Sequence, residues 1–206
     1  MKSSIWNFWA SRYDRLWVQK YSLKPTRNYI LNALSESKDI NNIKVLDLGC
    51  GTGQLISEMS EFFSSPIITG VDFSEKMLDI SKSRNPGAVH MQLNADELDK
   101  LKGNFDVIIC SHSFPYYNSP EKVMHELNRL LKNDGILLMA FASGNNVYDK
   151  FALSFVKLTT GPAYYPSDRE FREIVSPYFH VDDLQIIKEK FFMPRIALYK
   201  LKGATK

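Results

Sequence analysis

Cysteine is scarce in this sequence: Cys50 and Cys110 are the only two among 206 residues. Two cysteines cannot build the disulfide framework that stabilises many small secreted domains. Both fall at the ends of stretches that we predict to be interior strands, so we expect reduced thiols and a cytoplasmic protein. Their separation matches no metal-ligand spacing, and we predict no metal site.

Long apolar runs and a large excess of charge are also absent. A helix that spans a bilayer needs about 20 consecutive apolar residues, and no stretch of this sequence is that long, so we expect no stable membrane insertion. The aromatic N-terminus is interrupted by Arg12, Asp14 and Arg15 and lacks the pattern of a signal peptide. A formal net charge of +3 is too small to predict nucleic-acid binding. The length suits a single domain (residues 1–206), and the oligomeric state stays open.

A glycine-rich turn is the strongest feature of the sequence. Residues 45–48 form a short apolar strand, which leads into Gly49, Gly51 and Gly53 and then into an amphipathic helix. Glycine allows positive φ and a close approach of ligand to backbone, and the N–H groups that open a helix are unpaired. Asp47 adds a negative charge to the same place. This pattern predicts a ligand site.

Two ligand classes suit such a turn. A dinucleotide binds through its pyrophosphate to the pattern G-x-G-x-x-G, but here Gln54 takes the third glycine's position. Asp47 would also repel a pyrophosphate. A carboxylate favours a cationic ligand instead, and S-adenosyl-L-methionine (SAM) carries an ammonium and a sulfonium with no phosphate. The turn therefore favours SAM over a nicotinamide dinucleotide.

The run D-L-G-C-G-T-G at 47–53 resembles the first motif of class I SAM-dependent methyltransferases, and the resemblance continues over residues 44–138. Asp72, at the end of the second predicted strand, matches the acid that holds the ribose. Asp96 matches the acid that accepts a hydrogen bond from the adenine amino group. The resemblance implies these cofactor-binding residues: Asp47, Gly49, Cys50, Gly51, Gly53, Asp72, Phe73, Met77, Ala95, Asp96, Glu97 and Ser111. Phe73 and Met77 would flank the adenine.

The same resemblance implies an α/β fold: a Rossmann-like, seven-stranded, mostly parallel sheet with strand seven antiparallel and helices on both faces. Local patterns predict strands at 43–48, 67–72, 88–93, 105–110, 136–142, 180–187 and 195–201. A turn at 133–135 would precede the fifth strand, Ser74 would cap a helix, and Ser167 with Glu170 would form a capping box.

The N-terminal segment is aromatic. Trp6, Trp9, Tyr13 and Trp17 recur at helical spacing, which predicts one amphipathic helix over residues 4–20, and a second helix starts near Pro25. The stripe either packs on the domain or forms a lid that lines the substrate pocket, and both can hold. The resemblance implies that residues 1–40 are lid helices and that residues 144–178 are a variable substrate cap.

Methyl transfer from SAM needs mainly alignment, with a base only where the acceptor must lose a proton. The catalytic residues stay unknown: His112, Tyr13, Tyr116 and Tyr117 are candidates, and His112 is either a base or a neutral wall of the pocket. The motifs of nucleic-acid N-methyltransferases, cytosine C5 enzymes and catechol-type enzymes are missing after the fourth strand. The nearest resemblance is to small-molecule methyltransferases of the ubiquinone/menaquinone-biosynthesis type, which implies an apolar or aromatic acceptor. A nicotinamide-dependent oxidoreductase and a SAM-binding, non-catalytic partner subunit are the alternatives.

Overall fold

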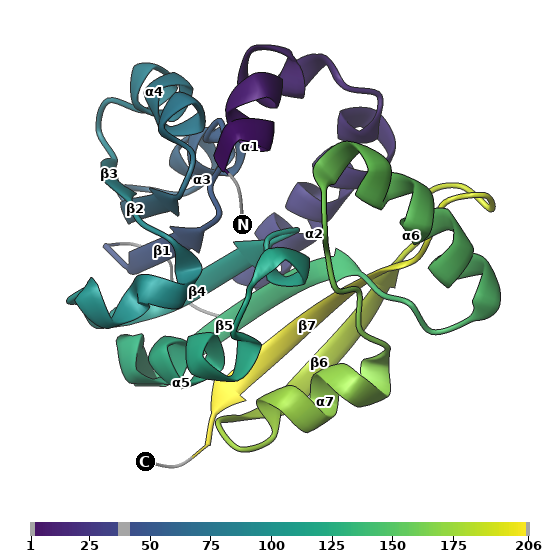
Figure 1. Cartoon of the computed structure of the whole chain (residues 1–206). Helices are drawn as coiled ribbons and strands as arrows, with labels where there is room; N and C mark the ends of the chain where they lie inside the picture. The colour runs from purple at the N-terminus through teal and green to yellow at the C-terminus, as the bar shows by residue number, and fades with distance from the viewer. Residues whose placement is uncertain (1–2, 37–41, 205–206) are drawn as a thin grey trace.

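The computed structural model describes residues 3–36 and 42–204, which fold around one seven-stranded sheet (Figure 1). The strand order is β3-β2-β1-β4-β5-β7-β6. The first five strands are parallel, whereas β7 is antiparallel to both of its neighbours. The strands are β1 (Lys44–Leu48), β2 (Ile67–Asp72), β3 (Val89–Gln92), β4 (Phe105–Ser111), β5 (Leu131–Ala142), β6 (Phe179–Ile187) and β7 (Ile196–Gly203). The predicted fold class is confirmed.

Helices cover both faces of the sheet. The helical elements are α1 (Ser3–Trp9), η1 (Ala10–Arg15), η2 (Gln19–Leu23), α2 (Lys24–Ser35), α3 (Gln54–Phe62), α4 (Glu75–Arg84), η3 (Ala95–Lys100), η4 (Phe114–Tyr116), α5 (Pro120–Leu130), α6 (Val147–Thr160) and α7 (Asp168–Val175). One core cluster joins α5 and α7 to one face, and a second joins α2, α3 and α4 to the other. Figure 1 shows α5 and α7 side by side below the sheet.

The central strands are apolar on both sides because both faces are covered. Alternate residues of β4 show this directly: Ile108 belongs to the first cluster, whereas Val107 and Ile109 belong to the second. Both cysteines are buried and free, as predicted. These strands end at one edge of the sheet, and the parallel order reverses between β1 and β4, where open α/β sheets bind ligands.

Most predicted element boundaries are confirmed within one or two residues. Ser74 caps α4 by accepting from the backbone N–H of Met77, and Ser167 with Glu170 forms the predicted capping box of α7. The fifth strand is a partial exception, since it begins at Leu131 and not at residue 136. The predicted turn lies inside the strand as a register shift, because Phe105 pairs with Leu131 but Val107 pairs with Ile136.

The single helix predicted over residues 4–20 is wrong. The segment changes from α-helix to a 3₁₀ helix after Trp9, and Leu16 is extended with ψ of 142° before the π-helical η2 begins. Tertiary hydrogen bonds from Asn7 and Asp14 to distant residues fix the first two pieces and outweigh local helical preference. The end of the second predicted helix, at Lys38, lies outside the described residues.

Candidate functional site

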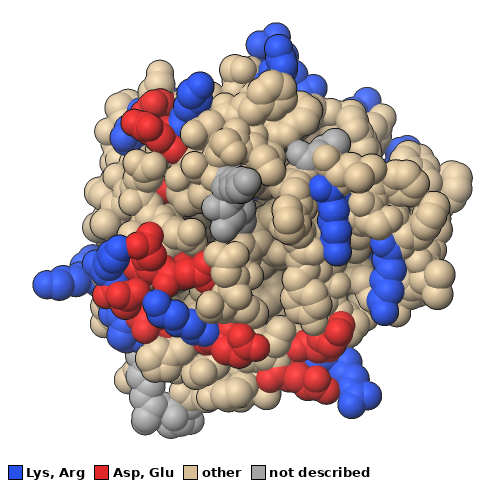
Figure 2. All heavy atoms as spheres, in the orientation of Figure 1, with Lys and Arg blue, Asp and Glu red and all other residues tan. Residues whose placement is uncertain are grey.

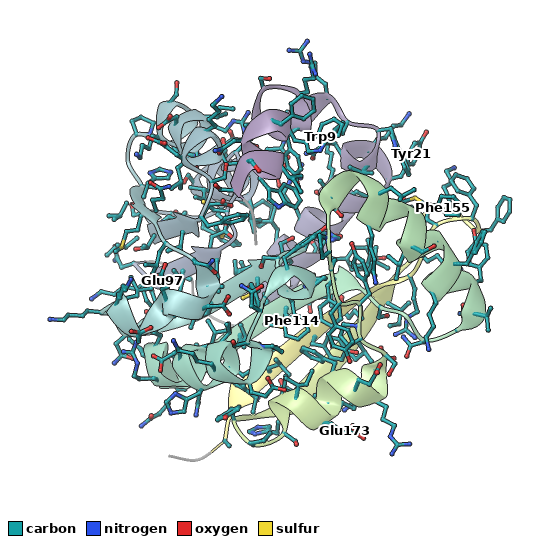
Figure 3. The ribbon with its side chains drawn as sticks, viewed as in Figure 1. Trp9, Tyr21, Glu97, Phe114, Phe155 and Glu173 are labelled. Carbon is teal, nitrogen blue, oxygen red and sulfur yellow. The ribbon has the colours of Figure 1, made fainter. Side chains whose placement is uncertain are left out.

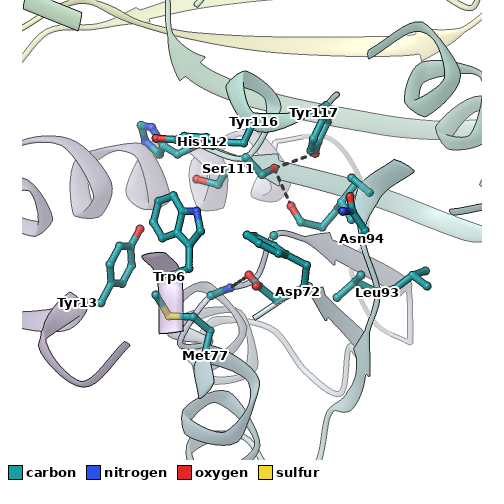
Figure 4. Close-up of a pocket in the computed structure, with 17 residues that line it drawn as sticks. Trp6, Tyr13, Asp72, Met77, Leu93, Asn94, Ser111, His112, Tyr116 and Tyr117 are labelled. Atoms are coloured by element: carbon teal, nitrogen blue, oxygen red, sulfur yellow. Dashed lines mark hydrogen bonds between the residues drawn. The ribbon is translucent and has the colours of Figure 1, made fainter. Parts of the chain in front are cut away.

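An open pocket lies where β1, β2 and β4 end (Figure 4). It encloses about 660 Å³ of space free of protein atoms, part of it open to solvent. Its walls are Trp6, Tyr13, Leu48, Gly49, Gly51, Val71, Asp72, Phe73, Met77, Leu93, Asn94, Ala95, Ser111, His112, Ser113, Tyr116 and Tyr117. We call it the main pocket.

A second pocket of about 420 Å³ adjoins the first. Tyr13, Gly49, Gly51, Ser111 and His112 line both. The remaining walls of the second pocket are Leu23, Arg27, Asp47, Cys50, Thr52, Gln54 and Leu55. We call it the side pocket. The two pockets together form one continuous site on either side of the glycine-rich turn.

The turn between β1 and α3 needs glycine for two reasons. Gly49, Gly51 and Gly53 all have positive φ, between 54° and 82°. A Cβ on Gly49 would also lie 2.5 Å from the Cβ of Ser113, and one on Gly53 would lie 2.2 Å from the Oγ of Ser81. Side chains at these positions would force the turn apart. Gly53 contacts α4 in this way and lines neither pocket.

Asp72 joins the turn to the end of β2. Its Oδ2 accepts from the backbone N–H of Gly51 at 2.9 Å, and its Oδ1 accepts from that of Ser74 at 2.8 Å. Burial raises the pKa of Asp72, and these hydrogen bonds oppose that rise. The side chain lines the main pocket. A backbone hydrogen bond from Phe73 also lowers the pKa of Asp72, and the carboxylate has about four lone-pair sites, so it can still accept from a ligand.

Asp47 lies in the side pocket with only 2% of its surface exposed. Its Oδ2 has no hydrogen-bond partner among residues 3–36 and 42–204. Burial and, less strongly, the charge of Asp72 raise the pKa of Asp47 to about 7. A buried carboxylate oxygen without a partner is costly, and a cationic donor would satisfy it. Arg27 lines the same pocket and pairs with Glu58, at 2.9 Å between Nε and Oε2.

Aromatic side chains line the outer end of the main pocket (Figure 4). The ring of Trp6 meets that of Tyr116 edge to face at 5.2 Å and that of Tyr13 at 6.2 Å. The Tyr116 and Tyr165 hydroxyls lie 3.3 Å apart. Asp72 is the only Asp, Glu, Lys or Arg on the walls of the main pocket in the part of the chain that the structure describes. This end therefore suits an uncharged group.

His112 lies between the two pockets with a φ of 58°, which is uncommon for a residue with a side chain. Its Nε2 is 3.1 Å from the Thr26 hydroxyl, which donates its own proton to the carbonyl of Ser22 at 2.7 Å. Nε2 must therefore carry the hydrogen, which leaves Nδ1 as an acceptor. Burial and the Arg27 charge lower the pKa of His112 to about 4, so the ring is neutral near pH 7.

The N-terminal segment, residues 3–23, covers the site and is tied to it. Asn7 accepts from the Ser74 hydroxyl at 2.6 Å, above the first turn of α4. Asp14 accepts from the Thr52 hydroxyl at 2.6 Å and pairs with Arg84. Trp6 and Tyr13 reach into the main pocket from this segment. Of the aromatic stripe, Trp6 and Tyr13 line the main pocket, whereas Trp17 is 62% exposed. That residues 1–40 act as a lid stays a prediction.

The structure does not bring every predicted site residue to a pocket wall. The main pocket receives Gly49, Gly51, Asp72, Phe73, Met77, Ala95 and Ser111, and the side pocket receives Asp47 and Cys50. Asp96 lines neither, because its carboxylate accepts from Ser119 N–H at 3.0 Å and from the side-chain amide of Asn118 at 2.6 Å. Glu97 instead pairs with Lys100 in solvent.

Sequence reasoning missed several residues that line the pockets. Leu93 and Asn94 precede the predicted adenine residues by one or two positions and lie on the wall of the main pocket. Ser113 fixes that pocket's inner end, since it donates to the carbonyl of Leu48 at 2.9 Å and lies 2.9 Å from the Tyr117 hydroxyl. Their place at or just after the ends of predicted strands was the only signal, and it does not distinguish wall residues from their neighbours.

Residues 46–139 match a family model described as a methyltransferase domain. The match identifies this part of the chain as a methyltransferase domain. The matched residues run from β1 to β5 and include Asp47, the glycine-rich turn and Asp72, so the match covers the core of both pockets.

Curated relatives of this chain have several names. A malonyl-[acyl-carrier protein] O-methyltransferase from Bacillus cereus is 31% identical over 149 residues, which cover 71% of this chain and 54% of that protein. A ubiquinone biosynthesis O-methyltransferase from Pelagibacter ubique is 32% identical over 109 residues, covering 52% and 45%. The chain thus spans about half the length of these curated relatives.

Solved structures share the methyltransferase fold. The crystal structure of magnesium protoporphyrin IX methyltransferase from Synechocystis PCC 6803 with bound SAH superposes with a TM-score of 0.76 at 18% identity, covering 98% of this chain and 99% of that one. At this identity the likeness concerns the fold alone.

SAM is the cofactor of this family, and the residues present fit it. The side pocket offers the Asp47 carboxylate, whose Oδ2 has no partner among the described residues, and the Arg27 guanidinium, which also pairs with Glu58. These groups complement the ammonium and carboxylate of an amino acid. The main pocket offers the Asp72 carboxylate and apolar walls at Phe73 and Met77. No group of three or more His, Cys, Asp or Glu side chains that could hold a metal ion occurs among residues 3–36 and 42–204. No helix in those ranges is long and apolar enough to cross a membrane.

Proposed function

We propose that this protein transfers the methyl group of SAM to a small, uncharged acceptor that is apolar or aromatic. The observation that carries the proposal is the junction of the two pockets at Gly49, Gly51 and Ser111. A ligand that passes this junction joins an amino-acid end beside Asp47 to a nucleoside end beside Asp72. SAM has this shape and this charge distribution.

We assign the parts of the cofactor to named residues. Asp47 holds the ammonium and Arg27 faces the carboxylate of the methionine moiety. Asp72 accepts from the ribose hydroxyls, while Phe73, Met77 and the segment 93–95 contact the adenine. Gly49, Cys50, Gly51 and Ser111 approach the middle of the cofactor, and Gly53 shapes the turn. Asp96 and Glu97 stay predictions from the family resemblance, since Asp96 is already engaged at the start of α5.

SAM supplies an activated methyl group, so the protein's own residues mainly orient the reactants and exclude water. Trp6, Tyr13 and Tyr116 supply an aromatic wall where the acceptor would lie. His112 Nδ1 can accept a hydrogen bond at the pocket junction. It can therefore orient a hydroxyl group of the molecule that receives the methyl group. With a pKa of about 4, His112 is too weak a base to take a proton early in the reaction.

The acceptor class follows from the walls of the main pocket. Apart from Asp72 they carry no charged side chain in the described part of the chain, so a charged acceptor would lose its hydration without gaining a partner. Relatives named for ubiquinone biosynthesis agree with a neutral aromatic acceptor. Relatives named for malonyl-[acyl-carrier protein] point to a carrier-bound acid instead, which this uncharged wall does not favour.

Isothermal titration calorimetry with SAM tests the proposal. Asp72→Ala should weaken binding by at least about tenfold, because two hydrogen bonds to a charged group are lost at the ribose. Asp79→Ala is the matched control, since Asp79 is an exposed acid on α4 outside both pockets. Unchanged SAM affinity in Asp72→Ala would contradict the assignment.

The non-catalytic alternative requires a separate measurement. Release of S-adenosylhomocysteine (SAH), the product that SAM leaves after methyl transfer, should be measured with a panel of quinols, phenols and carrier-bound acids. Turnover of a neutral aromatic acceptor supports the enzyme. Tight SAM binding with no turnover on any acceptor, together with a second chain that co-purifies in a fixed ratio, would instead support a SAM-binding partner subunit.

A further inference from the structure

The outer side of α6 carries an exposed apolar stripe. Val147, Phe151, Phe155 and Leu158 are 85%, 63%, 57% and 80% exposed. Their spacing of four, four and three residues puts them on one side of the helix. Leu153, on the opposite side, is buried and attaches the helix to the domain. Figure 3 shows Phe155 pointing away from the body of the molecule.

The turn between β6 and β7 extends this stripe. Phe191 and Phe192 are 88% and 49% exposed, and their rings meet edge to face at 5.5 Å. The Tyr148 hydroxyl of α6 donates to the backbone carbonyl of Phe192, which joins the two elements. We call the set Val147, Phe151, Phe155, Leu158, Phe191 and Phe192 the apolar face.

Lysines surround the apolar face. Lys150 and Lys157 belong to α6, and Lys188 and Lys190 belong to the turn; all four are exposed. Lys188 Nζ lies 6.0 Å from the centre of the Tyr148 ring, and Lys190 Nζ lies 5.7 Å from that of Tyr21 in η2. The acids on these two elements are Asp149, which is buried, and Glu189, which is exposed. Hydrogen bonds from Ser167 and, less strongly, the charge of Lys150 lower the pKa of Glu170, an exposed acid of α7. Four lysines against two exposed acids leave the rim basic. In Figure 2 the area over α6 is tan and blue without red.

We propose that the apolar face binds reversibly to an anionic lipid bilayer. Contiguous exposed apolar side chains mark interaction surfaces. A helix that lies in a membrane interface has phenylalanine and leucine on one side and lysines around them. Each lysine near anionic lipid adds favourable electrostatic attraction. Such binding is peripheral and differs from insertion of a membrane-spanning helix.

The shape and charge of the face favour lipid over a protein partner. Its most exposed side chains, Phe191 and Val147, protrude from a turn and from a helix start, and a fluid bilayer accommodates protruding groups without a matched groove. A second copy of this chain would meet the face across a two-fold axis and bring lysines against lysines. The charge therefore disfavours a dimer through this surface.

The C-terminal end of α6 lies near the main pocket. Just after it, a Cβ on Gly161 would lie only 2.9 Å from Ile5 of α1. The Tyr165 hydroxyl, just beyond, lies 3.3 Å from that of the pocket residue Tyr116. A bilayer on the face would thus bring an apolar compound dissolved in it close to the pocket. Lipid binding itself does not depend on the proposed function.

Vesicle flotation of the full chain tests the inference. Phosphatidylcholine vesicles are compared with vesicles in which about a third of the lipid is phosphatidylglycerol, at low and high salt. We expect the protein to float with the anionic vesicles at low salt and to release at high salt. The double variant Phe191→Ser with Leu158→Ser should lower the partition coefficient by at least about tenfold.

Two control variants make the result specific. Phe62→Ser with Val89→Ser removes two other exposed apolar side chains, which are 58% and 54% exposed, from α3 and β3, and it should float as the parent does. Lys188→Glu with Lys190→Glu should abolish flotation, whereas Lys102→Glu, beside β4, should not. SAM affinity, measured on every variant, reports folding independently. Absence of binding to anionic vesicles would overturn the proposal, as would equal flotation of the parent and the face variants. Self-association that only the face variants abolish would overturn the proposal in favour of a dimer. Salt-sensitive binding to an acidic carrier protein, without flotation, would overturn it in favour of that partner.

Discussion

Asp47 has a carboxylate oxygen that no described residue satisfies, although the side chain is almost completely buried. An acid whose folded-state pKa is raised is less ionised than in the unfolded chain. The contribution of Asp47 to the free energy of unfolding of the ligand-free protein therefore falls as pH rises from about 4 to about 7. The upper value is the pKa of this group in the fold. A bound ammonium would remove that penalty.

Binding of SAM should therefore depend on pH through Asp47. Below pH 7 the carboxyl must lose a proton before it can hold the ammonium, so SAM affinity should fall by up to about tenfold for each pH unit between 7 and 5. Calorimetry in two buffers of different ionisation enthalpy should show proton release at pH 6. Asp47→Asn should bind more weakly at pH 7.5 and show a flatter profile. A parent profile that is flat between pH 5 and 7 would contradict this role.

The sequence predicted those pocket-wall residues that have a position in a pattern. Asp47 and Asp72 lie at or next to strand ends, and the glycines lie in the turn between a strand and a helix, so their convergence follows from the parallel order. Asp96 follows a strand as well, but its partners Asn118 and Ser119 come from another loop. No local pattern predicts which of two neighbouring surfaces will engage a side chain.

The N-terminal segment illustrates the same limit for an element. Its aromatic stripe predicted a helix with one buried side, and Trp6 and Tyr13 do line the pocket. The break at Leu16 was not predictable, because it depends on hydrogen bonds from Asn7 and Asp14 to residues more than 35 positions away. Local propensity is a weak prior where such contacts compete.

Removal of the Asp14 contacts should loosen this segment over the cofactor site. In Asp14→Ala the Thr52 hydroxyl and the Arg84 guanidinium lose a common partner, and partial exposure limits the cost to about 1 kcal/mol. We expect SAM to dissociate about fivefold faster in stopped flow, with faster hydrogen exchange over residues 3–15.

Asp79→Ala is the control for exposed acids that pair with a neighbouring base, since its partner Lys82 lies 4.0 Å away on the same helix. Faster exchange with an unchanged dissociation rate would show that the segment covers the site without retaining the cofactor.

At the scale of the whole molecule, SAM should stabilise the fold by mass action. At about 100 times its dissociation constant a ligand adds about 2.7 kcal/mol to the free energy of unfolding, which for a chain of this size raises the melting temperature by about 5 to 11 °C. NAD at the same concentration should leave it unchanged, which separates the methyltransferase from the nicotinamide alternative. A larger shift with NAD would reverse the assignment.

The whole fold was more predictable than its parts, because seven strands with apolar patterns and a family resemblance leave few topologies. The order and direction of the strands came from that resemblance, and no strand's own residues specify them. The irregular start of β5 shows the difference: residues 133–135 have turn chemistry, yet they join a strand because Phe105 offers Leu131 a partner.

The position of β7 has a consequence for how the protein is made. Among the described residues Ile196–Gly203 is the strand that comes last in sequence, yet it hydrogen-bonds on both edges, to β5 and to β6. During synthesis β6 emerges before β7. It cannot join the sheet until β7 has paired with β5, because β7 lies between them. Nascent chains that stop short of residue 196 therefore expose an open edge of β5 to chaperones or to aggregation.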